Sequence, residues 1–116
     1  MTLPILISGK SDAAVAAQAK RLGAHLAGNP DLALADLTYS LATTRSHFEH
    51  RAVILSRDID AARAELDALA GGKAAPEVRR GQVRTGGELA FLFTGQGSQR
   101  PGMGRELHRL FPVYRD

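Results

Sequence analysis

The chain has 116 residues, of which 44% are hydrophobic and 5% aromatic, and its formal net charge is +3. This length suits one small domain, and the scattered basic residues lack the concentrated stripe and stacking aromatics of a nucleic-acid-binding protein. The absence of cysteine excludes disulfides, thiolate zinc sites and cysteine nucleophiles. No run approaches the roughly 20 apolar residues that span a bilayer, and no signal sequence is present, so we expect a cytoplasmic protein that contacts no membrane.

The first part of the chain predicts a strand followed by two helices. Leu3–Ser8 is a short apolar run typical of a buried strand. Ser11 offers an N-cap hydroxyl, and apolar residues at helical spacing follow as far as Leu26. Gly28 suits a left-handed C-cap, and a second helix is expected over residues 33–44. Because the joint between these helices is short, we expect them to fold back on each other.

Two further strands are predicted around a third helix. The segment RAVILS, residues 51–56, has β-branched residues at its centre and indicates a strand. Asp58 is the candidate N-cap of a helix that Gly71 and Gly72 end. The weakly alternating EVRRGQVR, residues 77–84, indicates an edge strand that a bulge at Gly81 could interrupt. The order β-α-α-β-α-β makes a complete small α+β unit.

The segment ELAFLF, residues 88–93, predicts a last strand that is apolar on both faces. Such a strand expects cover on both sides, as in a parallel α/β sheet. Only the start of one helix follows, and Pro112 should distort or end it. We therefore expect the chain to stop inside a second domain, with residues 1–86 forming the first domain and residues 87–116 the truncated start of the second.

A glycine-rich loop, TGQGSQRPGMG, joins that strand to the last helix. Gly95 and Gly97 supply two glycines of G-x-G-x-x-G, but the third is missing and no Walker lysine follows, which disfavours a nucleotide site. Ser98 lacks the flanking glycines of a G-x-S-x-G nucleophile elbow and is better explained as a turn or cap hydroxyl. Gln96 is the natural donor of one backbone N–H to an oxyanion, although an oxyanion hole needs two donors.

Two other groups of polar residues have simpler explanations. His47 and His50 are three residues apart but have no third ligand at a matching interval, so no metal site is predicted. Arg79, Arg80 and Arg84 could capture an acidic partner, or they could protect an exposed sheet edge.

The segment FLFTGQGSQRPGMGRELHRLFPVYRD resembles the start of the acyltransferase domain of modular type I polyketide synthases. The resemblance implies that Gln96 supplies an oxyanion-hole backbone amide in the complete domain. It also implies that the substrate loop contains Gly95, Gly97, Ser98 and Gln99. The family's nucleophilic serine, in a G-H-S-x-G motif, and its catalytic histidine have no counterpart in this chain.

Three upstream segments resemble the linker between the ketosynthase and the acyltransferase of the same enzymes. They are LPILISGKSDAAV, LADLTYSLATTRSHFEHRAVIL and VRRGQVRTGGELAFLFTGQGSQ. The resemblance implies a small three-stranded antiparallel sheet with helices on one face, which holds the two catalytic domains at a fixed distance. It also implies part of the docking surface for the acyl carrier protein, with Arg79, Arg80 and Arg84 as candidate contacts.

Together these resemblances imply a linker and interaction module that is inactive alone and binds no cofactor. Its parent enzyme would transfer a malonyl-type extender unit from coenzyme A to the phosphopantetheine arm of the carrier protein. Two alternatives stay open. The chain could be a free-standing docking or regulatory α+β domain, in which Leu89–Phe93 would pair with the first sheet, or, less in keeping with its residues, a nucleotide-binding protein.

Overall fold

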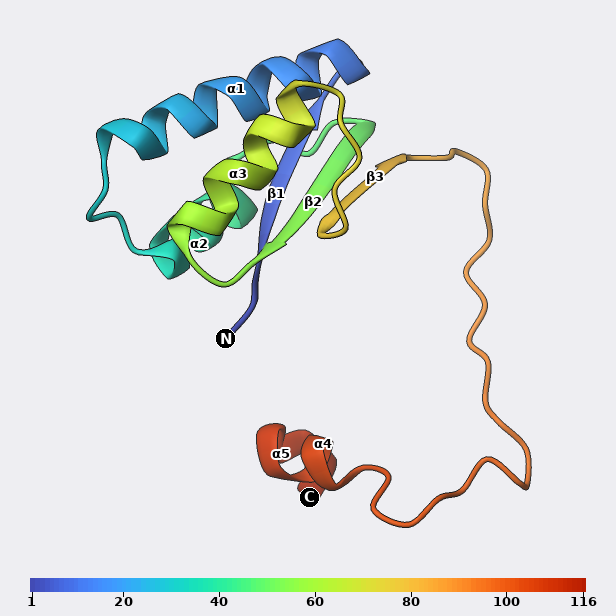
Figure 1. Cartoon of the computed structure of the whole chain (residues 1–116). Helices are drawn as coiled ribbons and strands as arrows, with labels where there is room; N and C mark the ends of the chain where they lie inside the picture. Colours follow the sequence, from blue (N-terminus) through green and yellow to red (C-terminus); the bar gives the residue numbers. More distant parts are fainter. The chain divides into compact units, whose positions relative to one another are not determined.

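The computed structural model describes residues 1–116, which form two compact units, Met1–Gly86 and Gly87–Asp116. The first unit contains three strands and three helices in the predicted order (Figure 1). These elements are β1 (Leu3–Gly9), α1 (Asp12–Gly28), α2 (Leu34–Thr44), β2 (His50–Ser56), α3 (Ile59–Ala70) and β3 (Val78–Gln82).

The three strands form one antiparallel sheet in the order β1-β2-β3. β3 is therefore an edge strand, as predicted. The predicted bulge at Gly81 is wrong, because Gly81 pairs directly with Arg51 and the register continues without an extra residue from Ile54↔Val78 to His50↔Gln82. The expected fold class, α+β with a three-stranded antiparallel sheet, is confirmed.

The hydrophobic core lies between the sheet and the helices α1 and α3, which pack against each other over one sheet face (Figure 1). Side chains of a strand alternate between its two faces, so Ile5 and Ile7 of β1 share this face with Ala52 and Ile54 of β2. The buried hydrophobic residues are Ile5, Ile7, Val15, Ala19, Leu26, Leu37, Ala52, Ile54, Ala62, Leu66 and Leu69.

Side-chain caps begin two of the helices where the sequence predicts them. Ser11 Oγ accepts a hydrogen bond from the Ala14 N–H at 3.1 Å, which starts α1. Asp58 Oδ1 accepts one from the Ala61 N–H at 2.8 Å, which starts α3. Each cap satisfies a backbone donor that the first helical turn would otherwise leave unpaired.

The end of α1 differs from the prediction. Gly28 is the last helical residue, and its φ is not positive, so it is not a left-handed cap. Asn29 ends the helix instead: its backbone N–H donates to the Leu26 carbonyl at 3.2 Å, and its side-chain amide donates to the His25 carbonyl at 2.8 Å. An asparagine side chain can satisfy terminal carbonyls, which removes the need for a left-handed glycine.

The helices α1 and α2 do not fold back on each other as predicted. α1 packs against α3 and β1, whereas α2 packs against β1. Both helices therefore pack on β1, and the short joint between them does not produce a helix pair.

The second unit contains two short helices, α4 (Arg105–Leu110) and α5 (Pro112–Arg115), and Pro112 interrupts helical structure as predicted. The strand predicted over Leu89–Phe93 is wrong for this chain, since these residues pair with no other segment. Leu89 is 83% exposed and Leu92 is 94% exposed. None of the helices of the chain has the length and apolar character to cross a bilayer.

Candidate functional site

The glycine loop is closed by its own hydrogen bonds. The Gly97 N–H donates to Oε1 of Gln99 at 2.9 Å. Ser98 Oγ lies within hydrogen-bonding distance of Thr94 Oγ1, at 3.0 Å, and of the Gly95 carbonyl, at 3.2 Å. Gly97 has a φ of +105°, a conformation that glycine adopts readily. These contacts make Ser98 a turn hydroxyl.

Gln96 lies at the exposed tip of this loop, and its backbone N–H takes part in no intramolecular hydrogen bond. Such an N–H is free to donate to an incoming acceptor. Acyl transfer requires a second donor and a nucleophile beside it. The loop residues themselves provide neither, so this loop can form only part of a reaction site.

The three candidate docking arginines do not form one patch. Arg79 pairs with Val53 and Arg80 with Ala52, so their side chains leave opposite faces of the sheet. The Arg80 guanidinium donates to the Leu69 carbonyl at 3.2 Å, at the C-terminal end of α3. A cation there also interacts favourably with the helix dipole. Arg84 follows the end of β3 and is exposed.

Arg79 has local partners of its own. Its guanidinium donates to the Pro76 carbonyl and, at 3.3 Å, to the Val78 carbonyl. Arg79 remains exposed, so its charge is accessible from the face of the sheet that α1 and α3 leave uncovered. Of the three arginines, Arg79 and Arg84 are therefore the two whose charged groups are not engaged with a helix end.

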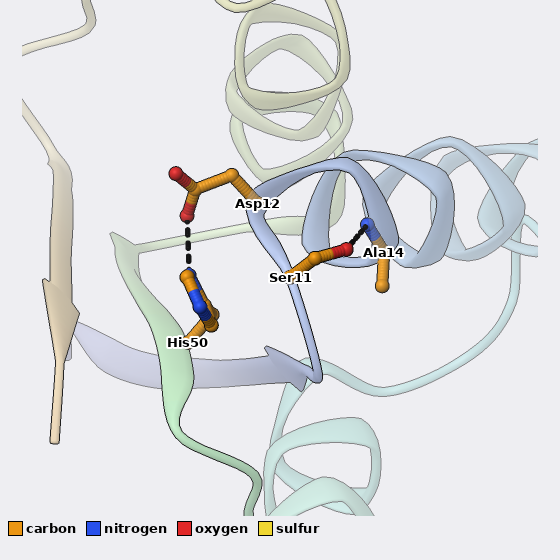
Figure 2. A network of polar contacts seen from close by, with 4 residues as sticks. All are labelled: Ser11, Asp12, Ala14 and His50. Atoms are coloured by element: carbon orange, nitrogen blue, oxygen red, sulfur yellow. Dashed lines mark hydrogen bonds and ion pairs between the residues drawn. The ribbon is translucent and has the colours of Figure 1, made fainter.

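A contact between Asp12 and His50 joins the start of α1 to β2, with 2.8 Å between Asp12 Oδ1 and His50 Nδ1 (Figure 2). Figure 2 also shows Ser11, the neighbouring residue, bonded to the Ala14 N–H. The His50 side chain is 22% exposed, whereas that of Asp12 is 89% exposed. Sequence reasoning missed this contact, because the two residues are 38 positions apart.

Glu65 on α3 has a pKa above its usual value. Burial is the main cause that raises the pKa of Glu65; the Ser56 side chain opposes it, and the Glu77 and Asp58 carboxylates add to it. Its Oε2 atom is buried without a hydrogen-bond partner. An unpaired buried oxygen weakens the folded state, so we interpret Glu65 as a stability feature rather than a reacting group.

The known proteins to which this chain is similar include polyketide synthases. Residues 4–66 match the family model described as CurL-like, PKS C-terminal, where PKS denotes polyketide synthase. The chain is 48% identical over 112 residues to the polyketide synthase GfsA of Streptomyces halstedii, and 50% identical over 112 residues to the spectinabilin polyketide synthase system protein NorB of Streptomyces orinoci. Each alignment covers 97% of this chain but only 2% of GfsA and 5% of NorB, so the chain spans a small part of these relatives.

Solved structures show the same fold. The acyltransferase domain of ZmaA matches 98% of this chain with a TM-score of 0.81 and 30% identity, and the match covers 26% of that domain's chain. The ketosynthase from module 6 of the bacillaene synthase of Bacillus subtilis 168 matches 70% of this chain with a TM-score of 0.67, over 14% of its own chain. At 21% identity, the likeness to the ketosynthase is one of fold alone.

The fold and these relatives define the class as a polyketide synthase polypeptide with an acyltransferase-like fold. Within this class, the chain belongs to the CurL-like, PKS C-terminal family. The resemblance to modular polyketide synthases that the sequence motifs indicated is thereby confirmed.

Proposed function

We propose that residues 1–86 form a linker that holds a ketosynthase and an acyltransferase apart within a polyketide synthase, and that residues 87–116 begin the acyltransferase. The observation that carries this proposal is the recurrence of the fold in two kinds of solved chain. It occurs in the ZmaA acyltransferase over 98% of this chain and in a bacillaene ketosynthase over 70% of it. A unit that accompanies each catalytic domain is suited to the junction between them.

The packing of the first unit supports a spacing role. Fully buried side chains such as Ile5, Ile54 and Leu66 fill its core. The connector between α2 and β2 is tied to β1, since Ser8 Oγ donates to the Ser46 carbonyl at 3.0 Å and accepts from the Phe48 N–H at 3.0 Å. A folded unit of this kind keeps its ends at a fixed separation, whereas a flexible linker samples many.

The exposed apolar segment supports the assignment of the second unit. Leu89, Phe91, Leu92 and Phe93 are 76% to 94% exposed. Contiguous exposed apolar side chains mark surfaces that contact other protein. We propose that this segment packs into the remainder of the acyltransferase, where Gln96 would donate its N–H to the oxyanion and the substrate loop would contain Gly95, Gly97, Ser98 and Gln99.

The parent enzyme of this proposal transfers a malonyl-type extender unit from coenzyme A to the phosphopantetheine of an acyl carrier protein. Arg79 and Arg84 are the proposed contacts of the acidic carrier protein, because their charges are exposed. Arg80 contributes less, since its guanidinium already binds the end of α3. The alternative of a free-standing domain required Leu89–Phe93 to pair with the first sheet, and that sheet has only three strands, none of them from this segment.

Replacement of the linker tests the proposal. In a polyketide synthase that carries this chain between its ketosynthase and acyltransferase, residues 1–86 are exchanged for a flexible glycine-serine segment. We expect the acyltransferase still to load malonyl groups, while polyketide chain elongation falls by about tenfold or more because the effective concentration of the partner domains drops. Unchanged elongation would contradict the spacing role. Malonyl transfer by the isolated chain would contradict the proposal that residues 87–116 are only the beginning of the acyltransferase.

A further inference from the structure

We propose that the groove between α1, β1 and the end of α2 binds an acidic amphipathic helix of a partner polypeptide. The groove has a volume of about 630 Å³ and lies wholly within the first unit. One wall is α1, and the opposite wall is the last turn of α2 with the connector that follows it. The helices α1 and α2 both pack on β1, and the groove lies between them.

The groove is lined by basic residues and by no acidic ones. Arg21 and His25 line it from α1, and Arg45 and His47 line it from the connector. None of the lining residues is an aspartate or a glutamate, although the chain contains 12 acidic residues. The ion pairs of the structure involve other residues, so Arg21 and Arg45 have no carboxylate partner. A groove with this charge attracts a partner of opposite charge.

The groove also offers apolar surface. Leu22 and Leu41 are only partly buried where they pack against the core, and both line the groove. Phe48 lines it as well and is 38% exposed, and the Lys10 ammonium lies 5.8 Å from the centre of the Phe48 ring. An apolar strip flanked by cations complements a helix that has apolar residues on one side and acidic residues along its edges.

The geometry favours a helix over a small anion. Arg21 and His25 are four residues apart and hence one turn apart on the same wall, while Arg45 and His47 belong to the other wall. Arg21 lies on one wall and Arg45 on the other, so the two guanidinium groups are distributed along two sides of the groove rather than gathered around one point. A helix about 10 Å wide can place carboxylates toward both walls at once, which a single phosphate cannot do.

A binding experiment with the full chain tests this site. The probe is a synthetic amphipathic peptide of about five helical turns, with leucines on one face and glutamates on both flanks. We expect saturable binding by fluorescence anisotropy that weakens with added salt. Amide chemical shifts should change around Leu22, Leu41 and Phe48 and remain constant in β3.

Matched variants locate the binding. Arg21→Glu with Arg45→Glu should weaken binding by about tenfold or more, whereas Arg109→Glu with Arg115→Glu, which changes the net charge equally at exposed positions outside the groove, should change it by less than about twofold. Phe48→Ala should also weaken binding without any change of charge. It therefore serves as the second test if the double reversal perturbs folding, which far-ultraviolet circular dichroism monitors.

Three results would overturn the proposal. They are the absence of saturable binding, an equal loss in the Arg109/Arg115 variant, and chemical-shift changes at the same amides caused by inorganic phosphate at lower concentration than the peptide. The last result would identify a small-anion site instead. The linker-replacement experiment measures elongation and not this groove, so either proposal can fail while the other stands.

Discussion

Gly9 ends β1 at a buried position beside the first turn of α1. A Cβ atom at Gly9 would lie 2.8 Å from Cβ of Ala14 and 3.0 Å from the backbone nitrogen of Val15. Overpacking of this kind costs about 1–3 kcal/mol, so Gly9→Ala should lower the free energy of unfolding by that amount. Gly28→Ala is the matched control, because no atom lies within 4 Å of that site, and its stability should be unchanged or slightly higher. Equal losses in urea unfolding would contradict this interpretation.

Glu65 should make stability depend on pH. Burial raises the pKa of Glu65 above its usual 4.5, so the folded state holds this proton more tightly than the unfolded state. The stabilisation from the protonated form is therefore complete below 4.5 and is lost as the pH rises through the raised pKa. Glu65→Gln should be more stable than the natural protein near neutral pH and lose this advantage in acid. A difference in unfolding free energy that is constant with pH would refute the assignment, with exposed Glu88→Gln as control.

Gln96 should act through its backbone and not its side chain. In a complete acyltransferase that carries this chain, Gln96→Pro removes the N–H, and we expect kcat to fall by about a hundredfold to a thousandfold, the usual effect of losing one oxyanion donor. Gln96→Ala keeps the N–H and should change kcat far less. Stopped-flow or steady-state measurement of malonyl transfer distinguishes the two. A comparable loss in both variants would point to the side chain.

At the scale of elements, the two N-caps, Ser11 and Asp58, should contribute equally to the free energy of unfolding. Ser11→Ala and Asp58→Ala each remove the acceptor of a first-turn N–H, and each should lower the free energy of unfolding by about 1 kcal/mol. Asp58→Asn retains an acceptor oxygen and should be nearly neutral. Thermal and urea unfolding provide the measurement. An Asp58→Asn variant as unstable as Asp58→Ala would show that the charge, and not the cap, carries the effect.

The elements that sequence reasoning predicted well depend on local signals. Ser11 and Asp58 begin helices because a cap involves only the next three residues. Gly81 and Gly28 were misassigned, since a glycine permits a bulge or a left-handed turn without requiring either. Gly81 pairs directly with Arg51, so no bulge forms there. After Gly28 the side chain of Asn29 caps the helix, so no left-handed glycine is needed.

Sequence reasoning did not predict contacts between segments that are far apart along the chain. Asp12 and His50 meet only because β1 and β2 pair in a register that brings Gly9 opposite His50. The predicted strand at Leu89–Phe93 failed for a related reason: apolar composition favours a strand, but a strand exists only where another segment supplies the ladder. The three candidate docking arginines likewise do not form one surface, because β3 places Arg79 and Arg80 on opposite faces of the sheet.

At the scale of the whole molecule, the sequence motifs were enough to indicate the family. The ordered linker segments followed by GQGSQ led to modular polyketide synthases, and the family model over residues 4–66 agrees. The basic groove was not visible in the sequence, because Arg21 and Arg45 line one groove only after α1 and α2 have both packed on β1.

The central claim is that residues 1–86 fold by themselves while Leu89–Phe93 requires protein that this chain does not supply. Native-state amide hydrogen exchange of the full chain, read by mass spectrometry, tests it most directly. We predict slow exchange in β1, β2, α1 and α3, whose amides are hydrogen-bonded over a buried core, and rapid exchange throughout residues 88–104, which form no ladder. Protection of Leu89–Phe93 comparable to that of β2 would contradict the claim.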